Sequence, residues 1–143
     1  MIEKVVDTLE KARDLISRGW CQLGSPLDIN MRPIGLFDEG ACRFPLEWAI
    51  VHAAHPEGGF FDVDDAVTYF DKVADCQDLV DETKRVVEFV IGDYPRQVRQ
   101  RDAVTFSLLQ SWNDAKGRTR DEVLDLLERS ISVAGLRLDR GDE

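Results

Sequence analysis

Cysteine and histidine are the residue types in this chain best suited to covalent or metal chemistry. The three cysteines, Cys21, Cys42 and Cys76, are far apart, which excludes a C-x-x-C metal motif and argues against a disulfide framework. The two histidines, His52 and His55, are one helical turn apart, but no third ligand is spaced to join them. A Cys21 nucleophile would need one of these histidines as its base, and nothing in the spacing pairs them. We therefore expect no catalytic residue, no metal and no cofactor.

A polar turn near the C-terminus is the most distinctive stretch, with the sequence W-N-D-A-K-G-R-T-R-D-E from Trp112 to Glu122. Thr119 and Glu122 have the spacing of a capping box, in which two side chains satisfy free amide groups at a helix start. Asn113 is suited to a left-handed position at the end of the preceding helix. Arg118 is long enough to reach an acid on a neighbouring helix or to bind an anionic ligand. The turn is thus either a structural joint or a binding site.

A second cluster, Trp20-Cys21-Gln22, directly follows the first predicted helix, where Gly19 fits a left-handed helix end. If the two clusters meet in space, they would form a candidate site for a ligand or partner. Its residues are Trp20, Cys21, Gln22, Asn113, Asp114 and Arg118. The alternative function carried by this site is that of a small-molecule-binding protein or an enzyme.

Charge is distributed unevenly along the chain, whose net charge is −10. Residues 56–93 contain eleven acids and three bases, so direct binding to nucleic acid is not expected, since phosphate contacts need a basic surface. An acidic face can bind a basic protein partner or can simply keep the protein soluble. The residues expected on this partner-binding face are Asp64, Asp65, Asp71 and Asp75.

Apolar residues recur at helical spacing in six segments, which predicts an all-α fold, a compact bundle of about six helices. The segments are 2–18, 45–55, 62–75 with Asp62 as its N-cap, 78–91 with Asp78 as its N-cap, one that begins between Arg96 and Asp102 and ends at Trp112, and 120–134 followed by Gly135. Residues 22–43 are irregular yet apolar, so this loop should pack on the core, with a possible minor β element near residues 27–36. We expect one domain over 1–138 and a frayed tail at 139–143.

The two motifs together resemble a family of small uncharacterised helical proteins from bacteria and their phages. Members have a W-N-D-x-x-G-R-T-x-x-E-V-L motif near the C-terminus, matched by Trp112–Leu124, and an N-terminal G-W-x-Q motif, matched by Gly19–Gln22. The resemblance implies no established activity. It does imply that the two turns belong together and pack side by side.

Composition and motifs together favour a small acidic cytoplasmic protein that acts by binding another protein. It would serve as an accessory or inhibitor protein of phage or mobile-element origin. The chain has no apolar run long enough to span a membrane, and its N-terminus carries acids where a signal peptide is apolar. The sequence leaves the partner and the oligomeric state open.

Overall fold

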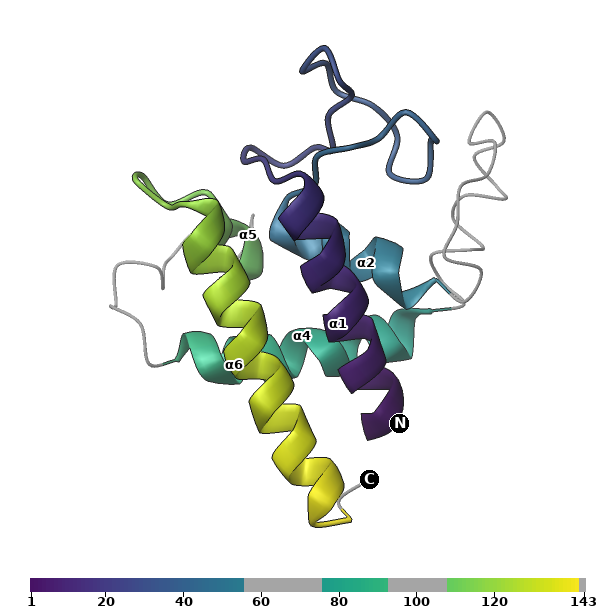
Figure 1. Cartoon of the computed structure of the whole chain (residues 1–143), viewed down its shortest axis with the longest axis vertical. Coiled ribbons are helices and arrows are strands. Elements are labelled where there is room, and N and C mark those ends of the chain that lie inside the picture. Colours follow the sequence, from purple (N-terminus) through teal and green to yellow (C-terminus); the bar gives the residue numbers. More distant parts are fainter. Residues whose placement is uncertain (56–75, 93–107, 142–143) are drawn as a thin grey trace.

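The computed structural model describes residues 1–55, 76–92 and 108–141, and this part of the chain forms five α-helices joined by turns and one long loop (Figure 1). The all-α fold predicted from the sequence is therefore confirmed. The helix expected at 62–75 lies outside the described residues, as does the first part of the helix expected to end at Trp112. In the described residues, no helix combines the length and the apolar character needed to cross a membrane.

The first and last helices, α1 (Ile2–Arg18) and α6 (Arg120–Asp139), lie side by side and form the centre of the fold (Figure 1). Each contributes a buried stripe at the spacing of one helical face: Val5, Leu9, Ala12 and Ile16 from α1, and Val123, Leu127 and Ala134 from α6. Arg13 of α1 forms an ion pair with Glu128 of α6 at 2.7 Å. The helix predicted to stop at Ala134 continues to Asp139, because Gly135 is tolerated in a helix interior at a modest cost.

Three further helices complete the core: α2 (Leu46–Ala54), α4 (Gln77–Ile91) and α5 (Leu108–Asn113). Seven of the nine residues of α2 are buried, consistent with a helix that is apolar on all sides. In Figure 1, α4 crosses behind α1 and α6, and it packs against both. Lys84 of α4 and Glu47 of α2 form a mostly buried ion pair at 2.7 Å, which fixes how these two helices face each other.

The long loop between α1 and α2 is clamped at its base and sends part of its length into the core. Phe44 pairs with Trp20, and Leu27 pairs with both Pro33 and Arg43, so the minor β element is present only as isolated bridges. The buried loop residues that pack against the helices are Leu36, Phe37 and Ala41. The prediction that the loop packs on the core is thus correct for its second half.

Gly19 ends α1 in an extended conformation, with φ −175°, so the predicted left-handed helix end is wrong. Glycine is required here for lack of space, because a Cβ atom at this position would lie 1.9 Å from the carbonyl oxygen of Cys42. The missing side chain allows the two ends of the loop to approach closely, and the amide of Phe44 donates to the Gly19 carbonyl at 3.1 Å.

The N-termini of α4 and α6 are capped differently. Thr119 and Glu122 form the predicted capping box at the start of α6, with the Glu122 amide donating to the Thr119 hydroxyl at 3.2 Å. Asp78 was the predicted cap of α4, but that helix begins at Gln77. Its N-cap position is Cys76, which makes no side-chain capping bond. Asp78 therefore falls in the first turn instead.

Replacing Thr119 with alanine is expected to lower the free energy of unfolding by about 1 kcal/mol, because one helix amide loses its acceptor. Thr119→Ser retains the hydroxyl, and serine caps helices at least as well as threonine, so this variant should unfold with about the same free energy as the wild type. Urea unfolding followed by circular dichroism measures both. Equal losses for the two variants would show that the hydroxyl is not the stabilising group.

Candidate functional site

The turn after α1 and the turn between α5 and α6 meet, as the family resemblance implies. Hydrogen bonds across this contact involve five of the six candidate residues, Trp20, Cys21, Gln22, Asn113 and Asp114. The sixth, Arg118, contacts Trp112 within the second turn, and we call the six residues the joint. Local sequence explains the arrangement, because α5 ends at Asn113 and Gly117 reverses the chain with a positive φ of 84° before Thr119 starts α6.

Asn113 is the centre of the joint and is completely buried. Its side-chain oxygen accepts hydrogen bonds from the Trp20 indole at 2.7 Å and from the Leu46 amide at 3.2 Å. Its side-chain amide donates to the Cys21 carbonyl at 3.2 Å. Asn113 is not left-handed, since Leu23 and Met31 are the non-glycine residues with positive φ in the described part of the chain. Asparagine is required here for the hydrogen bonds of its side chain and not for its backbone conformation.

Gln22 and Asp114 bind backbone atoms across the same contact. The Gln22 amide donates to the carbonyls of Asn113 at 2.9 Å and Ala115 at 3.2 Å. The Asp114 carboxylate accepts from the Leu23 amide at 2.8 Å. These bonds satisfy carbonyl groups left free where α5 ends and fix the first residues of the loop.

Arg118 lies over Trp112, with its guanidinium carbon 3.8 Å from the ring centroid. Its Nε donates to the Trp112 carbonyl at 2.9 Å, and its terminal nitrogen lies 3.3 Å from Glu122. A guanidinium stacked on an indole gains a cation–π contact as well as its hydrogen bonds. Arg118 therefore holds the turn to the end of α5.

The Cys21 thiol donates to the Ser25 carbonyl at 3.4 Å. Burial raises the pKa of this thiol to about 11, and the nearby Arg43 offsets only part of that rise. The thiolate is the nucleophilic form of cysteine, and burial of Cys21 disfavours that form.

Each polar side chain of the joint is thus used in contacts within the protein. Cavities of about 430 Å³ and about 300 Å³ lie along α1 and α2, and neither is lined by a residue of the joint. Ligand binding by these six residues stays a prediction, and their described contacts are those of a structural connection. The acidic residues Asp64, Asp65, Asp71 and Asp75 lie outside the described part of the chain.

The two histidines form an aromatic cluster with the long loop. The Phe37 ring lies 5.4 Å from the His52 ring and 5.0 Å from the His55 ring, and Phe44 meets His52 edge-on at 5.3 Å. His52 is 4% exposed, and burial, with smaller contributions from His55 and Arg18, lowers its pKa to about 4. His52 is therefore a neutral core residue at physiological pH. Among the described residues, no three metal-binding side chains gather at one point.

Three apolar side chains on the long loop are exposed to solvent, whereas the sequence predicts a loop that packs on the core. Leu23, Ile29 and Met31 are 84%, 78% and 57% exposed. Leu23 and Met31 also have positive φ, 73° and 64°, which side-chain-bearing residues rarely adopt. No local motif signals either feature, since ordinary loop chemistry places glycine or asparagine at such positions.

A family model described as a family of unknown function (DUF6197) matches residues 1–133. No curated protein and no solved structure matches the chain.

Proposed function

Because the chain belongs to a family of unknown function, DUF6197, we propose a function from its own surface: it binds another protein through the loop between α1 and α2. The observation that carries this proposal is the display of Leu23, Ile29 and Met31 to solvent on that loop. Exposed apolar groups on loops held by a rigid scaffold are typical of binding surfaces.

Backbone strain supports the proposal. A leucine or methionine in the left-handed region costs about 1–2 kcal/mol relative to its ordinary conformations. Such strain persists only where the surrounding structure imposes it, and it is concentrated at functional positions. Leu23 and Met31 combine this strained backbone with an exposed side chain. Folding stability therefore gives no reason for a large apolar residue at either position.

The loop is held in one conformation by polar contacts. The Asp28 carboxylate accepts from the amides of Asn30 at 2.8 Å and Arg32 at 2.9 Å, which closes the tip that carries Ile29 and Met31. At the base, the Trp48 indole donates to the Gly24 carbonyl at 2.9 Å. A surface ordered before binding loses less conformational entropy when its partner docks.

The charge of the chain bears on the kind of partner. A net charge of −10 favours a basic protein, which would be attracted over a distance before apolar contact is made. Within this proposal, the acidic residues 64–75 speed association and the loop supplies the contact. An accessory or inhibitory role in phage or mobile-element biology fits a small binding protein of this kind.

The test is affinity purification from host lysate with the wild-type protein and with a loop variant that carries Leu23→Asn, Ile29→Ser and Met31→Asn. Asparagine tolerates the left-handed region better than leucine or methionine, so the variant should unfold at the same temperature as the wild type or slightly above it. A bound protein retained by the wild type should be lost by this variant, as measured by quantitative mass spectrometry.

The control is a variant with Phe89→Ser and Leu136→Ser, which removes two apolar side chains of similar exposure, 65% and 62%, from α4 and α6. It should retain the partner. Retention of the partner by the loop variant, or recovery of no protein by the wild type, would reject the loop as a docking surface.

A further inference from the structure

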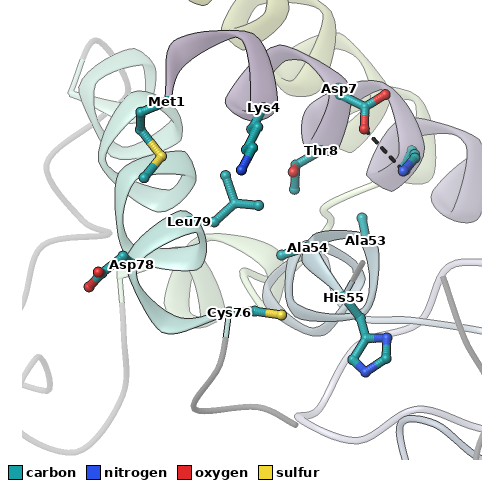
Figure 2. Close-up of a pocket in the computed structure, with 11 residues that line it drawn as sticks. Met1, Lys4, Asp7, Thr8, Ala53, Ala54, His55, Cys76, Asp78 and Leu79 are labelled. Carbon is teal, nitrogen blue, oxygen red and sulfur yellow. Dashed lines mark ion pairs between the residues drawn. The ribbon is translucent and has the colours of Figure 1, made fainter. Parts of the chain in front are cut away.

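A cavity of about 430 Å³ lies between α1, the end of α2 and the start of α4 (Figure 2). Its volume is within the range of sites that bind small molecules. The walls contributed by Ala53, Ala54 and Leu79 are apolar, whereas α1 contributes polar side chains. A ligand that fits this lining has an apolar body and one polar end.

Thr8 is the first of the polar groups on the cavity wall. The residue is only 2% exposed, yet its hydroxyl makes no hydrogen bond with any residue in the described part of the chain. A helical threonine can donate to the carbonyl four residues earlier, as Thr83 does to Leu79 at 2.7 Å. Thr8 instead faces the cavity (Figure 2). A ligand in the cavity that accepts a hydrogen bond from this hydroxyl would gain an interaction that the described residues do not supply.

Lys4 precedes Thr8 by one helical turn on the same face of α1, where side chains four residues apart are neighbours. Its ammonium group points into the cavity (Figure 2) and forms no ion pair within residues 1–55, 76–92 and 108–141. Lys11, the other lysine on the wall, pairs with Asp7 at 3.0 Å. Lys4 is therefore a cation that is available for a ligand.

The start of α4 borders the same cavity through Cys76, Asp78 and Leu79. This helix has 15 residues, and its N-cap, Cys76, makes no side-chain capping bond. The amide groups at a helix N-terminus favour an anion. Asp78, in the first turn of α4, also borders the cavity, but its carboxylate points away from the space between Lys4 and Leu79 (Figure 2).

We propose that this cavity binds a small organic carboxylate with an apolar body. The carboxylate accepts hydrogen bonds from the Lys4 ammonium and the Thr8 hydroxyl near the positive end of α4, and the apolar body lies against Ala53, Ala54 and Leu79. The Asp7 carboxylate does not compete for Lys4, because it is paired with Lys11. This site is separate from the protein-binding loop, so either assignment can fail without the other.

The test is an NMR titration of the ¹⁵N-labelled protein with butanoate, hexanoate, octanoate and phenylacetate, and with hexanamide as the uncharged counterpart of hexanoate. At least one carboxylate should shift the amide signals of Thr8, Ala54 and Leu79 in a saturable way. Hexanamide should bind about tenfold more weakly than hexanoate, because it lacks the charge that Lys4 contacts. If none of the carboxylates shifts these signals, or hexanamide binds as well as hexanoate, the proposal is wrong.

Two variants test the donors without disturbing the fold. Thr8→Val preserves the shape of the side chain and removes a buried hydroxyl, so it should fold as well as the wild type while its Kd for the carboxylate rises by about tenfold. Lys4→Met should raise the Kd by a similar factor. Lys116→Met, which removes an exposed lysine on the turn between α5 and α6, is the control and should bind as the wild type does. Wild-type affinity in both Thr8→Val and Lys4→Met would overturn the proposal.

Discussion

Asn113→Ala is expected to lower the free energy of unfolding by about 3–5 kcal/mol, the largest loss for any single side chain considered. The substitution leaves the Leu46 amide, the Trp20 indole and the Cys21 carbonyl without the partner that each has in the folded protein. A buried donor or acceptor left unsatisfied costs about 1–3 kcal/mol, so three such groups account for the total. Without these hydrogen bonds, the turn between α5 and α6 should no longer hold the residues that begin the loop after α1.

Urea unfolding measures this loss, with two matched comparisons. Trp20→Phe removes only one donor and keeps the bond between Asn113 and Leu46, so it should cost about 1 kcal/mol. Ser111→Ala lies on the same short helix and should change stability by less than about 0.5 kcal/mol. A loss for Asn113→Ala no greater than that for Trp20→Phe would mean that Asn113 is not the centre of the joint.

Acidification from pH 7 to pH 4 is expected to remove roughly 3 kcal/mol of stability through His52 alone. Burial first, and then His55 and Arg18, lower the pKa of this side chain from 6.5 to about 4. The unfolded chain therefore takes up a proton near pH 6.5, whereas the folded protein resists it until about pH 4. In this window the unfolded state binds more protons, so the free energy of unfolding falls as the pH falls.

The measurement is a set of urea unfolding curves between pH 8 and pH 4 for the wild type and His52→Gln. The variant has the same carboxylates, so subtracting its pH profile from that of the wild type leaves the contribution of His52. The difference should be constant above about pH 7 and should shrink as the pH falls towards 4. Parallel profiles over the whole range would show that His52 titrates alike in the folded and unfolded states.

Local patterns in the sequence predicted the helices well. The apolar spacing of Val5, Leu9, Ala12 and Ile16 identified α1 because that stripe is what the rest of the fold buries. Thr119 and Glu122 identified the start of α6, because a capping box is formed by residues three apart and needs no distant partner. Such features depend on neighbours in the chain, which a sequence contains directly.

Features that depend on distant residues were predicted less well. Position 19 requires glycine because the Cys42 carbonyl leaves no room for a side chain. Position 113 uses asparagine because its side chain binds Trp20 and Leu46. Rules for helix ends consider only neighbouring residues, so the left-handed conformation that they predict for both residues is wrong. The meeting of the two turns was expected only because both motifs belong to one family resemblance. The cavity at Thr8 has no local signature, since α1, α2 and α4 each supply part of its wall.

The pairing of α1 with α6 has a consequence for how the chain folds as it is made on a ribosome. The apolar stripe of α1 emerges before its main partner, α6, which is encoded more than a hundred residues later. Until α6 emerges, the part of the stripe that α6 covers stays exposed to water and to other chains, a situation that favours aggregation and chaperone binding. The contact between α1 and α6 therefore forms only after the residues between them have been synthesised, and contacts between such distant segments slow folding in general.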